Sequence, residues 1–256
     1  MTATDPNAKK LSEWNMQMWM GQICYEDAKY LEGSRKFKKA LSILDELNIR
    51  DQRRATNLNN LALCYCAQGK HDKADLLYEE AFRIDENSAH VDKDALAVDL
   101  ENMATHYRRQ GMFDRSEQLY RRALDILDKE EKTNALELAS CLNNMGILYC
   151  GQKKCHEAEP FFRKAVTLRA TKLGRRSKEY AESLIGLAAN LCMQGNCEEA
   201  EPMFEEGIRV LGYKVGPHPE LADALELYVE HLRMIGKKAD ANGVKKRINS
   251  IRKKKY

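Results

Sequence analysis

Asparagine recurs at a fixed spacing along this chain. Asn60, Asn102 and Asn144 follow one another at intervals of 42 residues, and Asn59 and Asn143 lie beside two of them. A side-chain amide carries donors and an acceptor on one planar group, so it can pair with a peptide unit as another backbone would. Because asparagine is a poor helix former, its recurrence within predicted helices requires a compensating hydrogen bond. The spacing predicts either a row of amides that contact an extended peptide or amides that cap and bridge helices.

Two arginines are the second candidate for binding chemistry. Arg108 and Arg109 lie near the end of the predicted helix that carries Asn102. Guanidinium groups in a groove would favour an acidic ligand, since they pair well with carboxylates and phosphates. The alternative interpretation is that both arginines belong to a solvated helix end.

The cysteines recur as well, without a zinc pattern. Cys66, Cys150 and Cys192 share one column of the 42-residue period, and the last two begin C-x4-C pairs with Cys155 and Cys197. Neighbouring thiols could bind a metal or sense oxidation, but structural zinc sites use tighter paired spacings. A cysteine is also commonly a small buried apolar residue. We therefore expect no metal and no cofactor.

Enzyme signatures are missing from the sequence. The chain contains no glycine-rich phosphate loop, no HExxH and no G-x-S-x-G, and its six histidines are scattered without carboxylate partners at helical spacing. The sequence therefore predicts a protein that is not an enzyme.

The elements that would position these residues repeat with the same period. Residues 142–165 predict two short helices joined by a tight turn, with small residues such as Gly146 and Ala158 close to the large Tyr149 and Phe162. The same columns return upstream and downstream at 42-residue steps. Self-similarity at a fixed period indicates a stack of helix pairs that pack on their neighbours. The sequence contains no run of about 18 apolar residues, so we predict no membrane span.

The predicted fold is all-α, a right-handed α-solenoid of about six helix-turn-helix repeats. We expect the leading helix to run from Leu11 to Leu31. The expected organisation is a disordered N-terminus at 1–10, leading helices and a degenerate first repeat at 11–51, four 42-residue repeats at 52–212, and a sixth repeat with a basic capping helix at 213–256.

The repeated columns resemble those of tetratricopeptide repeats. The period, together with LNNLALCYCAQGK (58–70) and AEPFFRKAVTLRATKLG (158–174), is similar to the lengthened repeats of kinesin light chains. The resemblance implies that first helices line a concave groove and that its asparagines contact the main chain of an extended peptide. It therefore implies a peptide-binding groove at Asn60, Asn102 and Asn144, with the neighbouring candidates named above.

The expected function is a protein–protein interaction scaffold, or adaptor, with a protein or peptide partner. One alternative is nucleic-acid binding through the basic tail at 245–256; it ranks lower because a nucleic-acid footprint usually follows a face of the fold. The other is a structural subunit bound through the convex face or the end repeats. Eight cysteines without a secretion signal indicate reduced thiols and a cytoplasmic location. We expect a monomer or part of a larger complex, with no membrane partner.

Overall fold

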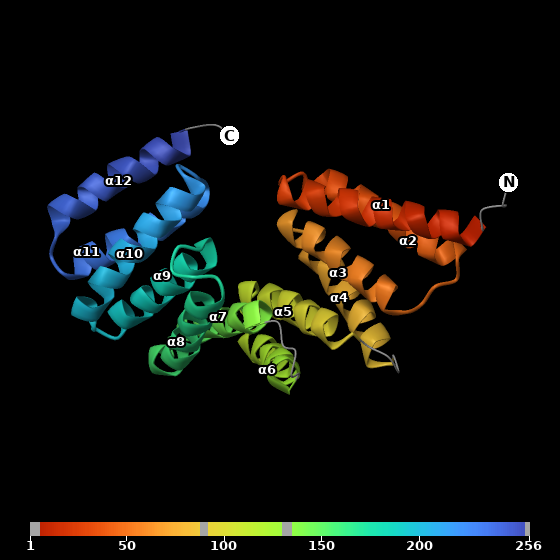
Figure 1. Ribbon diagram of the computed structural model, residues 1–256, viewed down its shortest axis with the longest axis horizontal. Helices are drawn as coiled ribbons and strands as arrows, with labels where there is room; N and C mark the ends of the chain where they lie inside the picture. The colour runs from red at the N-terminus through yellow and green to blue at the C-terminus, as the bar shows by residue number, and fades with distance from the viewer. Residues whose placement is uncertain (1–5, 88–91, 130–134, 254–256) are drawn as a thin grey trace. The chain divides into compact units, whose positions relative to one another are not determined.

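The computed structural model describes residues 6–87, 92–129 and 135–253, which form helices joined by turns (Figure 1). Within these residues the helices form six successive pairs, so the predicted all-α fold of about six helix-turn-helix repeats is confirmed. No described helix is both long and apolar enough to cross a membrane. The helices are α1 (Pro6–Glu26), α2 (Tyr30–Glu46), α3 (Gln52–Ala67), α4 (His71–Glu86), α5 (Lys93–Arg109), α6 (Phe113–Lys129), α7 (Ala135–Gly151), α8 (Cys155–Lys172), α9 (Lys178–Met193), α10 (Cys197–Val215), α11 (Pro219–Met234) and α12 (Lys238–Lys253).

The chain forms two compact units, which we describe separately. The N-terminal unit spans Met1–Ile126 and the C-terminal unit spans Leu127–Tyr256. In the N-terminal unit, α1 packs on α2 and α3 packs on α4, while α3 also contacts α1, α2 and α5. In the C-terminal unit, the pairs are α7 with α8, α9 with α10, and α11 with α12, and α9 contacts both α7 and α11. Within each unit, helix pairs therefore pack on their neighbours in sequence, as the repeat period requires.

Hydrogen bonds join the third helix pair, α5 and α6. The hydroxyl groups of Thr105 and Tyr120 lie 2.7 Å apart, and the buried Ser116 hydroxyl donates to the Ala104 carbonyl at 2.7 Å. Tyr120 is fully buried, because it occupies the aromatic column of the second helix that the sequence pattern predicts as core.

Small residues beside an aromatic ring let the helices of the C-terminal unit approach closely. Phe162 of α8 is 1% exposed. A Cβ atom added at Gly146 of α7 would lie 2.8 Å from Cε2 of this ring, and one added at Gly186 of α9 would lie 2.9 Å from Cε1. The ring therefore fills the space that two glycines leave where α7, α8 and α9 meet.

Most turns within a helix pair use a glycine in the left-handed backbone region. Gly69, Gly111, Gly195 and Gly236 have φ angles of 72°, 77°, 88° and 79°. At the equivalent turn between α7 and α8, Lys153 has a φ of 63°. A side chain in this region costs roughly 1–2 kcal/mol, which glycine avoids. The turn at Lys153 therefore carries strain that the glycine turns do not.

The first helix pair differs from the sequence prediction at both ends of α1. Helix α1 begins at Pro6, so residues 6–10, which we expected to be disordered, are helical; residues 1–5 lie outside the described residues. Proline suits a first helical position, since its φ is preset and its missing N–H would have no partner there. The predicted extension to Leu31 is also wrong. The chain turns at Ala28, with a φ of 58°, and α2 begins at Tyr30.

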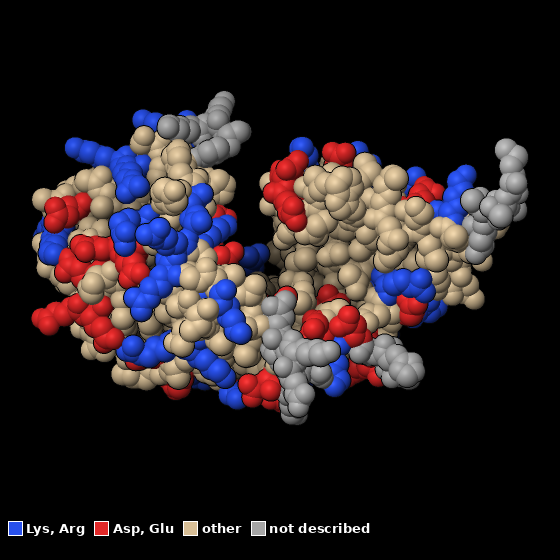
Figure 2. All heavy atoms as spheres, in the orientation of Figure 1, with Lys and Arg blue, Asp and Glu red and all other residues tan. Residues whose placement is uncertain are grey.

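The last helix, α12, packs on α11 through one apolar stripe. Ala241, Ile248 and Ile251 are buried, while the basic residues between them are exposed. Figure 2 shows Lys and Arg side chains over the part of the C-terminal unit where Figure 1 places this helix. Arg252 pairs with Glu226 of α11 at 2.8 Å. The described part of the basic tail is therefore part of a packed helix.

Candidate peptide-binding groove

The first helices of the C-terminal unit surround an apolar hollow. Its volume is about 610 Å³, and its lining comes from α7, α9 and α11, with Phe162 and Leu211 contributed by α8 and α10. This size is within the range of 300–1,000 Å³ typical of ligand pockets. Its apolar walls include Ile147, Ile185, Ala189, Met193 and Leu227.

Two of the wall residues lie at positions that the core does not need. Met193 is 53% exposed and Leu227 is 45% exposed, although both are large and apolar. Ile185 and Leu227 follow Asn143 at steps of 42 residues. The same repeat position therefore contributes one lining residue from each of α7, α9 and α11. An exposed apolar cluster lined by such residues is typical of a binding surface.

Carboxylates of α9 and α11 contribute to the rim of the hollow. Glu182, Glu220 and Asp223 are among its lining residues. Burial raises the pKa of Glu182, while Lys178 and then Arg169 act to lower it. Lys178 lies 2.7 Å from a carboxylate oxygen of Glu220 and 3.7 Å from one of Glu182. Arg252 lies 3.3 Å from Oδ1 of Asp223. Three acids against Lys178 and Arg252 leave the rim a small excess of negative charge, which favours a basic rather than an acidic ligand.

Asn143 is the predicted groove residue that lines the hollow, and a buried arginine holds it in place. Arg169 of α8 is 7% exposed and donates from Nη1 to the Ser183 hydroxyl at 2.8 Å. Ser183 in turn donates to Oδ1 of Asn143 at 3.0 Å. This chain of bonds occupies the carbonyl oxygen of the amide, so its NH2 group is the part that could donate to a bound peptide.

A second asparagine of the hollow, Asn190, was missed by the sequence analysis. Its Oδ1 accepts a hydrogen bond from the Cys150 thiol at 3.2 Å. Burial raises the pKa of Cys150 to about 12, so this thiol stays protonated at neutral pH. The Nδ2 atom of Asn190 is buried and finds no hydrogen-bond partner among the described residues. A buried donor without a partner is costly. Asn190 is 0% exposed, so a ligand carbonyl would satisfy its Nδ2 only after neighbouring side chains of the hollow move.

Asn59 serves the protein itself and is not exposed to a groove. It is 3% exposed, and its side chain hydrogen-bonds to Asp99 of α5. Contact of Asn59 with a peptide would therefore require breaking a buried interhelical bond. Asn143 makes the equivalent contact to Ser183 in the C-terminal unit. The helix-bridging alternative therefore applies to both of these positions.

The remaining predicted residues are divided between the two units. Asn60 and Asn102 are half-buried in the N-terminal unit, on α3 and α5, and Asn144 is half-buried on α7 of the C-terminal unit. Arg108 is half-buried and hydrogen-bonds to Tyr120, whereas Arg109 is exposed at the end of α5. None of these five residues lines the hollow described above.

A fold of stacked helix pairs with a hollow on its first helices defines a helical-repeat interaction protein. The family model described as Tetratricopeptide repeat matches residues 15–87, 94–171 and 149–212. The chain therefore belongs to the tetratricopeptide repeat family. No curated protein matches the chain significantly.

Solved structures support the same fold. BtubC (BKLC) from P. vanneervenii is 20% identical with a TM-score of 0.66, over 93% of this chain and 91% of that one. A structure described as kinesin light chain TPR-like repeats, from Podosopora anserina, is 16% identical with a TM-score of 0.64, over 84% and 100% of the two chains. The Rap conjugation gene regulator of plasmid pLS20, in complex with the Phr* peptide, is 17% identical with a TM-score of 0.69, over 93% and 62%. The predicted kinesin-light-chain-like repeat fold is confirmed.

Proposed function

We propose that the protein is a non-enzymatic adaptor that binds an extended segment of a partner protein on the first helices of its C-terminal unit. The observation that carries the proposal is the apolar hollow of about 610 Å³ with carboxylates at its rim. An apolar side chain of the partner occupies the hollow, and a neighbouring Lys or Arg pairs with the carboxylates. The proposed location is the cytoplasm.

Main-chain recognition comes from the amides of the hollow. The buried Nδ2 of Asn190 has no partner among the described residues, so a peptide carbonyl is the acceptor that it lacks. Asn143 offers a second amide nitrogen on the neighbouring helix. In the proposal, Asn144 adds such a contact on α7 of the C-terminal unit, and Asn60 and Asn102 make separate contacts of the same kind within the N-terminal unit. The Rap regulator bound to Phr* gives a precedent for peptide binding in a protein of similar fold.

The test is a peptide selection on the full chain, followed by titration of the best peptide by fluorescence anisotropy. Ala189→Phe fills the hollow, and Ala239→Phe makes the same change on the exposed surface of α12. Burying one apolar side chain is worth roughly 1.5–3 kcal/mol, so we expect Ala189→Phe to weaken binding about 10- to 150-fold at ~1.4 kcal/mol per tenfold. Ala239→Phe leaves affinity unchanged.

Equal affinity of Ala189→Phe and the wild type would contradict the groove proposal. Selected peptides that share acidic residues, and no basic residue beside an apolar one, would contradict the proposed chemistry. Unchanged affinity of the Asn102→Ala/Asn144→Ala variant would remove the contribution of these two asparagines.

A second candidate function is a structural subunit that docks through its end repeat. Helix α1 exposes Met16, Trp19 and Ile23, which are 57%, 66% and 37% exposed and are spaced so that they share one helix face. An exposed apolar stripe of this kind favours a protein contact. A partner whose binding is lost in Trp19→Ser but kept in Ala189→Phe would assign the contact to this end helix.

A further inference from the structure

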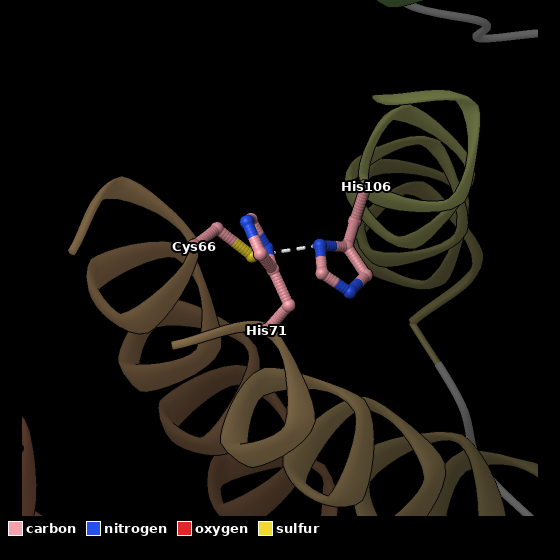
Figure 3. Close-up of side chains that lie close together, drawn as sticks. All are labelled: Cys66, His71 and His106. Carbon is pink, nitrogen blue, oxygen red and sulfur yellow. Dashed lines mark hydrogen bonds between the residues drawn. The ribbon is translucent and has the colours of Figure 1, made fainter. Parts of the chain in front are cut away.

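Three metal-ligating side chains converge in the N-terminal unit. Cys66 near the end of α3, His71 at the start of α4 and His106 on α5 place one ligand atom each within 4.8 Å of the others. Figure 3 shows the three side chains pointing toward one another from three different helices. The Sγ atom of Cys66 lies 2.9 Å from Nδ1 of His106, and the two imidazole centroids are 5.7 Å apart.

The C-terminal unit holds a second cluster of the same kind. Cys192 of α9, Cys197 at the start of α10 and His231 of α11 also place their ligand atoms within 4.8 Å of one another. The Sγ atom of Cys192 lies 2.8 Å from Nδ1 of His231. The Nε2 atom of His231 is buried and has no hydrogen-bond partner among the described residues.

The two clusters occupy equivalent places in the repeat. Cys192 and Cys197 follow Cys66 and His71 by three periods of 42 residues, and each histidine comes from the first helix of the next pair. The rings of Tyr78 and Phe204 lie beside the two histidines, with centroid distances of 5.3 Å and 5.2 Å. The same constellation therefore arises twice from separate parts of the chain.

The orientation of His106 suits a metal ligand. Its Nε2 atom lies 2.6 Å from Oδ1 of Asp75, so in the tautomer that donates from Nε2 to this carboxylate the Nδ1 lone pair faces Cys66. A carboxylate that orients a histidine in this way commonly supports a metal ligand. The Gln110 amide nitrogen lies 2.5 Å from the same Nε2 atom. With Nε2 protonated, the Gln110 amide is turned so that its oxygen, which can accept, faces this atom.

We propose that the two clusters are Zn²⁺ sites, each with three protein ligands and a fourth position for water. Cysteine thiolate and histidine nitrogen are the ligands that zinc prefers, and three protein ligands with one open position is a known zinc arrangement. Binding exchanges the proton of each ligating thiol for the metal, and that proton leaves to solvent. Each ion ties a first helix to the first helix of the next pair.

The distances allow this with a small adjustment. Zn–S and Zn–N bonds of about 2.3 Å and 2.0–2.1 Å in a tetrahedron place the ligand atoms roughly 3.5 Å apart. The sulfur–nitrogen distances of 2.9 Å and 2.8 Å are those of a thiol hydrogen bond, so they must widen by about 0.6–0.7 Å to admit the ion. The other ligand atoms lie within 4.8 Å and must close by up to about 1.3 Å.

A disulfide cannot account for both clusters. The N-terminal cluster contains a single cysteine, so the chemistry common to both clusters is metal ligation. The C-x4-C spacing alone gives no zinc signal, because the histidine comes from the next helix pair, 40 residues after Cys66 and 39 residues after Cys192.

The chain contains its own reference site between the two clusters. Cys150, Cys155 and Asn190 follow Cys66, His71 and His106 by two periods of 42 residues. At this place Asn190 stands where the N-terminal cluster has His106, and it bonds to Cys150. An amide oxygen is a ligand suited to hard ions rather than to zinc. Variants at this place are therefore matched controls.

The test is a titration of the metal-free, reduced full chain with Zn²⁺ in competition with a chromogenic chelator. We expect two equivalents bound to the wild type, one to His71→Ala, one to Cys197→Ser and none to the double variant. His71 is exposed and Cys197 is half-buried, so both substitutions are compatible with folding, which circular dichroism checks. The control variants His156→Ala and Cys155→Ser retain two equivalents. Co²⁺ gives thiolate-to-cobalt absorption that each single variant reduces.

Three results would overturn the proposal. The first is a wild type that takes no Zn²⁺ from the chelator, including one that binds only Cu⁺. The second is a double variant that still binds two equivalents. The third, for the C-terminal site, is a disulfide between Cys192 and Cys197 that persists under the reducing conditions of the titration.

Discussion

A buried carboxyl group makes the stability of the N-terminal unit depend on pH. Asp99 of α5 is 9% exposed, and its Oδ2 finds no hydrogen-bond partner among the described residues. Burial raises the pKa of Asp99 to about 7, while the hydrogen bond from Asn59 lowers it and the neighbouring Asp85 raises it further. Asp99→Asn keeps the shape of the side chain and removes its charge.

The expected effect follows from the direction of this shift. An aspartate in an unfolded chain titrates near pH 3.9, so between about pH 4 and pH 7 the folded state binds more protons than the unfolded state. The free energy of unfolding therefore falls as pH rises through this window. A shift of about three pKa units corresponds to about 4 kcal/mol at 1.36 kcal/mol per unit. Asp99→Asn should recover a stabilisation of this order at pH 8 and almost none at pH 4.

Tryptophan fluorescence can measure this in the intact chain. Both tryptophans, Trp14 and Trp19, lie in α1, so their signal during urea unfolding reports on the N-terminal unit. The control is Asp125→Asn, which changes an exposed aspartate of α6. The reasoning is refuted if Asp99→Asn and the wild type have the same free energy of unfolding at pH 8. It is also refuted if the gain in stability from Asp99→Asn is as large at pH 4 as at pH 8.

Two further predictions concern the C-terminal unit and use urea unfolding followed by circular dichroism. Lys153→Gly should stabilise the chain by about 1 kcal/mol, because glycine relieves the left-handed backbone of this turn; a destabilised variant would contradict the strain. Gly146→Ala should destabilise it, since overpacking against Phe162 costs about 1–3 kcal/mol and exceeds the ~1 kcal/mol that alanine gains in a helix. Gly243→Ala is the matched control, because a Cβ there meets nothing within 4 Å; equal effects at both glycines would rule out the steric cause.

The sequence predicted the repeat architecture well because its determinants are local. Tyr78, Tyr120, Phe162 and Phe204 lie at one position of the second helices, and all four are fully buried. A period of small and aromatic residues can be found in the sequence without knowing any long-range contact. The end of α1 was predicted poorly for a related reason. Its turn uses Ala28 where most later turns use glycine, so the usual stop signal is missing.

The candidate sites were harder to predict because they depend on which first-helix side chains meet across neighbouring pairs. Asn59 and Asn102 are equally polar in the sequence, yet Asn59 is buried against Asp99 and Asn102 is only half-buried. The clusters of cysteine and histidine depend on His106 and His231, whose positions differ by one residue from a strict repeat. Contacts between neighbouring helix pairs depend on the angle between the helices. The residues at one repeat position of the sequence do not reveal that angle.

The contacts of this fold have a consequence for how the chain is made. In the C-terminal unit, for example, Lys178 of α9 bonds to Glu220 of α11, 42 residues away, and α9 contacts helices of its own and the adjacent pairs. Low sequence separation of contacts favours fast folding, because only short loops must close before a contact forms. Within each unit, a chain that emerges from the ribosome can therefore pack one helix pair against the previous one before the next has been synthesised.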